Sequence, residues 1–551
     1  MITRPSFACR RGARLPLLLG LLLALLALAK PSQAEPVQAE PNDPLFRSSG
    51  SWGQPFADQW ALKQLRVHAT AANLGRASAP QQTVVAVIDT GIDYEHPDLA
   101  TSQLWRNPAE TRNGRDDDDN GYVDDLIGWN FVDNTNNPWD LSGHGTHIAG
   151  AIAACTNNQT GIAAINPDAR IMTLKVANFA GQARSSAVAA ALYYAVDQGA
   201  RVINLSLGGE LATDLERKAA AYAQDKGVLL VVSAGNRGLK LDNNGYPGLP
   251  GALVVGASDQ ADARAGFSAF GAGLDVVAPG VDVVSLRARD TDFIALSEPL
   301  DYEPGAATLG QDAAYYRASG TSFAAALVSG LASRLLSLNP QLTLTQLRNL
   351  LTESAVDVEA PGIDALSGFG RIDFARASSA DPDQLTVARL TGVDLSLEDQ
   401  QILLAIQGQA QASSFSGAEL FVRPKQEVVT APAPAPVLSK KEQRAKERAE
   451  REARKREARQ RQKNKGKDVP PPFDPSAWQS LAQLEKPVPE VGVLTTLRLD
   501  ELIERTGGAR AWEVKLAVVN ASGVNREAVL EMALPAPEPL REAAAGERGG
   551  R

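Results

Sequence analysis

Three short segments of the 551-residue chain carry side chains that could act together in catalysis. Asp89 ends an apolar run, His144 stands between two glycines, and Ser322 follows a Gly-Thr pair at the start of an Ala-rich stretch. Nucleophilic serine chemistry needs a hydroxyl, an imidazole that takes its proton, and a buried carboxylate that fixes the imidazole tautomer. The three segments supply one of each.

Each of these residues also has a purely structural interpretation when it is taken alone. Asp89 would cap a strand end, His144 would be a loop histidine, and Ser322 would be a helix N-cap. Their order along the chain, Asp then His then Ser, is one of the three orders known for catalytic triads. The joint occurrence in that order favours the chemical interpretation.

The elements that must position these residues alternate between strands and helices. Apolar, β-branched runs at 83–88, 170–176, 201–206, 228–233 and 253–257 alternate with helical patterns at 185–198, 214–226, 322–338 and 343–354. Such alternation predicts a doubly wound α/β fold with a mostly parallel sheet, here over residues 81–378. Functional sites of such folds lie at the carboxyl ends of the strands, which is where Asp89 stands.

The three segments resemble, in sequence as well as in order, the signatures of the subtilisin-like serine proteases, the subtilases. The resemblance covers roughly residues 81–378. It implies that Asp89, His144 and Ser322 form a catalytic triad that hydrolyses peptide bonds in polypeptide substrates through an acyl-enzyme. In that arrangement Ser322 attacks the scissile carbonyl, His144 shuttles the proton, and Asp89 orients the imidazolium.

Two further segments resemble the family's substrate-binding parts. The run 231–236 is similar to its Ala-Gly-Asn segment, which implies that Asn236 donates to the oxyanion of the tetrahedral intermediate. The run 202–209 is similar to its substrate-binding edge, which would pair with an extended peptide. The residues implied in substrate binding are Ser206, Leu207, Gly208, Ser233, Ala234 and Gly235.

The sequence departs from the family pattern just after the proposed nucleophile. Where the family usually has Met, and then Pro and His a few residues on, this chain has Phe323, Ala326 and Leu327. These changes keep a second interpretation open, in which the chain is a catalytically weak homologue that acts as a peptide-binding or scaffold module. The lead-in at 35–80 is also too short for the chaperone-like propeptide that many secreted subtilases carry.

An acidic loop between Asp89 and His144 resembles the start of a calcium-binding loop. Oxygen donors at Asp116, Asp118, Asn120 and Asp124 occupy loop positions 1, 3, 5 and 9, Gly121 occupies position 6, and Tyr122 offers its carbonyl at position 7. Six aspartates within ten residues repel one another unless a cation or water relieves them. We therefore expect a structural Ca²⁺ here; the alternative is a solvated acidic loop.

The N-terminus predicts export. Four arginines precede an apolar run from Leu15 to Ala29, followed by Ser32-Gln33-Ala34, which is typical of a signal peptide over residues 1–34. The apolar run is short for a membrane span, although an uncleaved anchor is the alternative. The expected location is periplasmic, cell-surface or secreted.

Composition and charge exclude several classes of protein. Apolar residues make up 44% and charged residues 22%, which is typical of a globular protein. Cys9 and Cys155 are the only cysteines, and Cys9 lies in the predicted signal peptide, so a disulfide framework and a Cys-based zinc site are excluded. Residues 1–34 hold five basic and no acidic residues, so their removal leaves a net charge of −14.

Beyond residue 378 the apolar pattern changes to a period of two, which predicts a β-rich C-terminal domain over 379–430 and 473–537. A Pro/Ala linker and a basic helix interrupt it at 431–472, and residues 538–551 are expected to be a disordered tail. Between 440 and 467 there are 14 basic and 5 acidic residues. We favour a stiff spacer over binding to an anionic surface, and we expect no specific nucleic-acid binding because the segment has no aromatics for base stacking. A role of 379–551 in adhesion is compatible with either function.

Overall fold

The computed structural model describes residues 40–68, 81–100, 103–208, 211–241, 244–291, 307–360, 362–383, 385–398, 401–412, 415–425, 477–521 and 525–534. The predicted signal peptide at 1–34, the linker and basic helix at 431–472, and the tail at 538–551 lie outside these residues.

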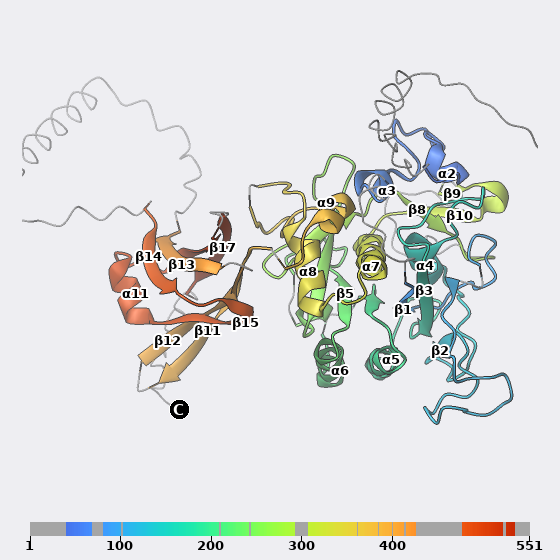
Figure 1. Cartoon of the computed structure of the whole chain (residues 1–551), viewed down its shortest axis with the longest axis horizontal. Helices are drawn as coiled ribbons and strands as arrows, with labels where there is room; N and C mark the ends of the chain where they lie inside the picture. Colours follow the sequence, from blue (N-terminus) through green and yellow to red (C-terminus); the bar gives the residue numbers. More distant parts are fainter. Residues whose placement is uncertain are drawn as a thin grey trace, which may run out of the picture.

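A seven-stranded sheet in which all neighbouring strands are parallel forms the centre of the larger domain (Figure 1). Its strands, in spatial order, are β2 (Gly128–Asn130), β3 (Ala169–Lys175), β1 (Thr83–Asp89), β4 (Val202–Leu205), β5 (Leu229–Ser233), β6 (Ala252–Ser258) and β7 (Val276–Pro279). The strand order reverses direction beside β1, so the carboxyl end of β1 is a topological switch point. The predicted doubly wound α/β fold is thus confirmed.

Helices cover both faces of this sheet because its strands are apolar on both sides. In β1, Val85 and Val87 belong to the apolar cluster that includes α4 (His144–Ala153) and α7 (Thr321–Leu338), whereas Ala86 and Ile88 belong to the cluster of α5 (Ser185–Asp197) and α6 (Asp214–Asp225). Full burial of a Val or Ile contributes about 1.5–3 kcal/mol relative to exposure. The two clusters fix the carboxyl end of β1 between two packed layers.

Helix α7 is the central helix of the larger cluster. It is the one helix among the described residues that is long and apolar enough to cross a membrane, but 89% of its most apolar window is buried inside the protein. It ends at Leu338, just before Asn339-Pro340, because proline cannot continue a helix. The chain continues through α8 (Leu344–Glu353), which Thr343 and Gln346 cap reciprocally, and α9 (Phe374–Ser379).

The lead-in is packed into the same body as the sheet. Its helices are α2 (Pro44–Arg47) and α3 (Trp60–Gln64). Leu45, Trp60 and Leu65 are buried in the cluster that contains α7. The side-chain amide of Gln59 exchanges two hydrogen bonds of 2.8 and 2.9 Å with the backbone of Ala163. The lead-in is therefore an integral part of the sheet domain.

A small antiparallel sheet precedes α7 and leads the chain toward the proposed nucleophile. Its strands, in spatial order, are β8 (Val283–Leu286), β10 (Tyr315–Ala318) and β9 (Thr308–Leu309). Two short 3-10 helices, η2 (Tyr246–Gly248) and η3 (Gln311–Ala313), complete this domain. Because β10 is held on both sides, the start of α7 follows directly from a fixed strand.

The C-terminal region forms two antiparallel sheets that pack on a common core (Figure 1). One contains β11 (Val387–Glu398), β12 (Gln401–Gln411) and β15 (Val488–Arg498). The other contains β14 (Gln479–Leu484), β13 (Phe415–Pro424), β16 (Ala511–Asn520) and β17 (Asn525–Ala533), and α11 (Leu499–Arg505) follows β15. Trp512, Val514, Leu516 and Val518 are all buried in this core, which confirms the predicted period of two.

The C-terminal sheets lie on the α8 side of the larger domain (Figure 1). Charged side chains join the two parts. Arg348 of α8 donates two hydrogen bonds, of 2.8 and 2.9 Å, to the buried carboxylate of Asp275. Arg389 of β11 contacts the same carboxylate. Arg526 of β17 donates a 2.9 Å hydrogen bond to the backbone carbonyl of Glu353 at the end of α8.

Candidate active site

Asp89 and His144 meet at the carboxyl end of β1. Nδ1 of His144 lies 2.8 Å from Oδ1 of Asp89, which also accepts a 2.7 Å hydrogen bond from the backbone amide of Thr90. Asp89 is fully buried. Because an ionised carboxylate can only accept, Nδ1 carries the proton and Nε2 is left as the basic nitrogen. The sequence-predicted carboxylate and imidazole are thus brought together in the tautomer that base catalysis requires.

A glycine permits this close approach between β1 and α4. A Cβ atom on Gly145 would lie 2.1 Å from the backbone oxygen of Gly91 and 3.2 Å from Oδ1 of Asp89. Any side chain at this position would push the start of α4 away from β1. His144 therefore reaches Asp89 because its neighbour is a glycine.

Asp140 holds the loop that leads into α4, and sequence reasoning missed it. Its Oδ1 accepts from Thr90 Oγ1, Ser142 N and Gly143 N, each at 2.9 Å, and its Oδ2 accepts from the amide and hydroxyl of Thr146. Asp140 is fully buried. Its position four residues before His144 was the available signal, because a carboxylate there can satisfy the free amides at a helix start.

Two opposing effects act on the pKa of His144. Burial disfavours the charged imidazolium, whereas attraction to Asp89, the hydrogen bond with Asp89 and attraction to Asp140 favour it. The carboxylates prevail, so the pKa of His144 is raised above its ordinary value. The site therefore stabilises the protonated form of this histidine.

Ser322 stands in the first turn of α7, where backbone amides favour developing negative charge. Its Oγ donates a 3.1 Å hydrogen bond to the backbone carbonyl of Ser206, and Ser206 Oγ donates a 3.1 Å hydrogen bond to the carbonyl of Ser322. The end of β4 and the start of α7 are therefore tied together at the hydroxyl. The Ser322 side chain is largely buried, with 8% of the residue exposed.

Asn236 lies beside the start of α7 in a fixed orientation. Its Oδ1 accepts hydrogen bonds of 2.8 Å from both the amide and the hydroxyl of Thr321. These donors identify which end of the amide is the oxygen, so Nδ2 points to the other side. Nδ2 lies 3.3 Å from the place that a Cβ on Gly320 would occupy. The amide donors of Asn236 are thus held close to the residues that precede Ser322.

The six residues implied in substrate binding lie at the carboxyl ends of β4 and β5. Because these two strands are parallel neighbours, their following segments emerge at the same edge of the sheet. The backbone of the second segment is held by hydrogen bonds from Ala234 N to Val255 O and from Gly235 N to Thr321 Oγ1, of 2.8 and 3.1 Å. Gly208, in the first segment, is exposed. An extended peptide could pair at this edge.

The three residues that depart from the family pattern belong to the apolar core around α7. Phe323, Ala326 and Leu327 are all buried. The ring of Phe323 lies beside His144, with 5.6 Å between the ring centroids. The departures therefore alter the packing behind the site and leave the positions of the hydroxyl, imidazole and carboxylate occupied.

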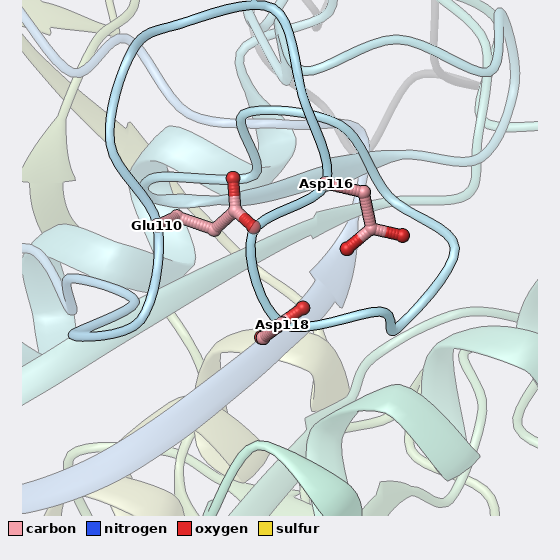
Figure 2. Close-up of side chains that lie close together, drawn as sticks. All are labelled: Glu110, Asp116 and Asp118. Carbon is pink, nitrogen blue, oxygen red and sulfur yellow. The ribbon is translucent and has the colours of Figure 1, made fainter.

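The acidic loop brings together a set of carboxylates that differs from the predicted one. Single oxygens of Glu110, Asp116 and Asp118 lie within 4.8 Å of one another (Figure 2). The amide of Tyr122 donates to Asn120 Oδ1, and Asp124 instead accepts from the amides of Asn113 and Gly114. Glu110 precedes the loop motif, and the spacing of that motif contained no signal for it. Carboxylate oxygens at this separation are a donor set suited to Ca²⁺.

Asp43 of the lead-in and Asp98 of the sheet domain are a pair of buried carboxylates. Asp43 accepts from the amides of Asn157 and Asn158, and Asp98 accepts from Asn158 Nδ2 and from the amide of Ile162. Burial raises the pKa of Asp98 to about 6, and the like charge of Asp43 acts in the same direction. Both carboxylates are completely buried.

Comparison with known proteins identifies the family. The model of the subtilase family matches residues 81–370. The chain is 40% identical over 255 residues to a thermophilic serine proteinase of a Bacillus species, strain AK1, which is 46% of this chain and 52% of that protein. It is 37% identical to thermitase of Thermoactinomyces vulgaris over 46% of this chain and 74% of that protein. It is 34% identical to subtilisin Savinase of Lederbergia lenta over 58% of this chain and 98% of that protein.

The chain thus spans about half the length of the first of these relatives and nearly the whole of Savinase. The match to the family model covers more than half of this chain, and it includes Asp89, His144, Asn236 and Ser322. The chain belongs to the subtilase family.

Proposed function

We propose that this protein is an exported serine endopeptidase that uses Asp89, His144 and Ser322 as its catalytic triad. The observation that carries the proposal is the 2.8 Å contact between His144 Nδ1 and the buried Asp89, at the sheet edge that Ser322 also reaches through Ser206. Family membership supports the same reaction class, since two of the relatives compared are named as a serine proteinase and a subtilisin.

In the proposed reaction, Ser322 Oγ bonds to the carbon of the scissile carbonyl while His144 Nε2 takes the hydroxyl proton. The tetrahedral intermediate collapses as the C–N bond breaks, and the imidazolium gives its proton to the leaving amine. Water then attacks the carbonyl carbon of the acyl-enzyme while His144 takes its proton. The bond to Ser322 Oγ breaks, and the imidazolium returns the proton to this oxygen. Asp89 remains ionised throughout and stabilises the imidazolium.

The developing oxyanion would be bound by Asn236 and by the backbone amide of Ser322. Asn236 Oδ1 is already held by Thr321, so its Nδ2 needs little reorganisation to donate. A donor of this kind is typically worth about 10²–10³ in turnover. The segments at Ser206–Gly208 and Ser233–Gly235 would hold the substrate in an extended conformation.

The proposal is tested with unfolded casein and purified mature protein. Ser322→Ala should abolish cleavage. Ser333→Ala is a matched control, because Ser333 is also buried in α7 and its hydroxyl donates a 2.7 Å hydrogen bond to the backbone carbonyl of Gly330. Ser333 lies about three turns of helix beyond Ser322. Equal cleavage by the parent and the Ser333 variant, with none by the Ser322 variant, is the expected result.

The alternative function is a catalytically weak homologue that binds peptides. The observation that favours it is the set of replacements at Phe323, Ala326 and Leu327 behind the site. A folded parent that binds casein fragments but shows no turnover would establish this alternative and overturn the enzymatic proposal.

We further propose that Ca²⁺ binds the acidic loop and stabilises the segment between β1 and α4. Glu110, Asp116 and Asp118 would supply carboxylate oxygens, and the carbonyl of Tyr122 would lie in the same loop. The ion would relieve the repulsion among these carboxylates. Its part would be structural, because the loop is separate from the triad residues in the sequence and none of its carboxylates contacts His144 in the described hydrogen bonds.

Calorimetric titration with CaCl2 and thermal melting with and without a chelator test this site. Glu110→Gln with Asp118→Asn should remove the calcium uptake of the loop. Asp98→Asn, which removes one carboxylate of the buried pair, reports separately on whether a cation binds there. An unchanged calcium isotherm in the Glu110 and Asp118 variant would exclude the loop as the site.

We propose that residues 1–34 direct export and are removed, and that residues 440–467 act as a spacer. Mass spectrometry of the exported protein should find an N-terminus near residue 35. Deletion of 440–467 should leave binding to heparin and to anionic vesicles unchanged; a loss of binding would instead assign this segment to an anionic surface.

A further inference from the structure

The ring of Phe323 lies beside two imidazoles, those of His144 and His147. Its centroid is 5.6 Å from that of His144, with 45° between the ring planes, and 4.4 Å from that of His147, with 55° between the planes. Phe323 is almost fully buried. Its ring also lies 3.3 Å from the place that a Cβ on Gly320 would occupy. The side chain after the nucleophile is therefore packed against the residue proposed as the base.

The second imidazole, His147, is held neutral. Its Nε2 lies 3.0 Å from the backbone carbonyl of Tyr316 and donates to it, because a carbonyl oxygen can only accept. Burial lowers the pKa of His147 to about 3. The Phe323 ring thus lies beside His147, an imidazole that stays uncharged, and also beside His144, which gains and loses a proton during the proposed reaction.

The titratable groups around His144 come from three places. Asp89 is the last residue of β1, Asp140 lies in the loop before α4, and His147 lies in α4 itself. The two carboxylates attract the imidazolium. The side chain of Phe323 in α7 also lies beside His144 and presents an apolar ring to it. A cation that lies over the face of an aromatic ring, within about 6 Å of its centroid, is attracted by the ring quadrupole.

We propose that Phe323 is a positioning residue that supports the imidazole of His144 from the side of α7 and stabilises its protonated form. The part of Phe323 in catalysis rests on the proposed function. Its physical core, a contact between the Phe323 ring and the His144 ring, does not depend on turnover. The family resemblance implies Met at this position, so the ring is a departure from that pattern.

Two effects with linked directions follow from the proposal. Loss of the ring removes stabilisation of the imidazolium, so the pKa of His144 falls by about half a unit. The acid limb of kcat/KM, which reports the deprotonation of the base, then moves to lower pH by the same amount. On the plateau above the limb, kcat falls about threefold or more, because the imidazolium formed during attack is less stable. A simple loss of folded protein would lower activity without moving the limb.

The experiment compares Phe323→Leu and Phe323→Met, which both remove the ring and keep an apolar side chain of similar size. Phe374→Leu is the matched control, since Phe374 is fully buried in the same core and its ring contacts Arg334 instead of an imidazole. The pKa of His144 is measured by NMR of the imidazole protons in a Ser322→Ala background. The pH profile of kcat/KM is measured in the parent background.

The expected result is a lowered pKa of His144 in both Phe323 variants and an unchanged value in the Phe374 variant. An unchanged or raised pKa in either folded Phe323 variant overturns the proposal. Since the NMR measurement uses an inactive background, an inactive parent would overturn the proposed function and would leave the inference about Phe323 standing or falling on its own titration. Two replacements are used so that one that fails to fold does not remove the test.

Discussion

Asp140 accepts two hydrogen bonds from Thr146, one from its backbone amide at 3.0 Å and one from its hydroxyl at 2.7 Å. The two residues bracket His144 along the chain, so this carboxylate closes the first turn of α4 around the proposed base. The other oxygen of Asp140 binds Thr90, the residue after Asp89. One buried side chain thus fixes the His144 turn and the Asp89 turn relative to each other.

Asp140→Asn is expected to lower both stability and turnover. The amide group that replaces one carboxylate oxygen would face backbone N–H donors, and each buried donor left unsatisfied costs about 1–3 kcal/mol. Loss of the negative charge also lowers the pKa of His144, because Asp140 is one of the groups that raise it. The urea midpoint and the pH profile of kcat/KM measure these effects.

Asp133→Asn is the control for this prediction, since Asp133 lies in the same loop region and accepts from Asn130 Nδ2 instead of from α4. A control variant that lost as much activity as Asp140→Asn would contradict the specific role given to Asp140.

The pH dependence of activity follows from the raised pKa of His144. The base must be neutral to accept the proton of Ser322, so activity falls as the pH drops through the pKa of His144. Attraction to Asp89 and Asp140 outweighs burial, so the acid limb of kcat/KM is expected above the ordinary histidine value of about 6.5. A limb well below that value would show that burial prevails in the free enzyme.

Glu353 makes the attachment of the C-terminal sheets sensitive to pH. Burial raises its pKa to about 8, against the attraction of Arg526 and Arg389. A carboxyl whose folded pKa is raised holds a proton that the unfolded chain has already lost, so the free energy of unfolding falls as pH rises from about 4.5 to 8. Glu353→Gln keeps a neutral side chain and should remove this component.

The prediction for Glu353 is measured as the difference between parent and variant in urea unfolding at pH 5.5 and pH 9. The variant should be more stable than the parent at pH 9 by a few kcal/mol, since one pKa unit corresponds to about 1.36 kcal/mol, and the difference should shrink at pH 5.5. A difference that is the same at both pH values would show that Glu353 is already ionised in the folded protein.

Replacement of Asp275 is expected to lower the stability of the protein more than replacement of Arg389, its partner across the two domains. Asp275→Asn leaves Arg348 and Arg389 facing each other without their shared anion, and an uncompensated buried charge costs about 3–5 kcal/mol. Arg389→Met leaves Asp275 paired with Arg348 and should cost less. Lys425→Met, which breaks the exposed pair with Glu531, should change stability by no more than about 1 kcal/mol. Equal losses in the Asp275 and Arg389 variants would contradict this ranking.

Much of the sheet domain could be predicted because its signals are local. The apolar run at 83–88 and the Ala-rich pattern at 185–198 correspond to β1 and α5 within one residue at each end. Short strands such as β2 were missed, since three residues carry too little periodicity. The antiparallel sheet before α7 was missed for the same reason.

The contacts between side chains distant in the sequence could not be predicted from it. Nothing in the spacing indicated that Glu110 would join Asp116 and Asp118, because Glu110 precedes the motif and reaches it only through the fold of the loop. The ion pair between Asp275 and Arg389 depends on how the C-terminal sheets pack against the larger domain. The residues of the proposed triad could be named from the sequence because each lies in a local signature, and the fold brings Asp89 and His144 into contact.

Covalent labelling of Ser322 tests the central proposal most directly. The mature protein is treated with a fluorophosphonate, digested, and analysed by mass spectrometry for the modified peptide, with Ser322→Ala and Ser333→Ala treated in parallel. The label is expected on Ser322 in the parent and in the Ser333 variant, and on no serine of the Ser322 variant. A folded parent that takes up no label, or takes it up on another serine, would contradict the assignment of Ser322 as the nucleophile.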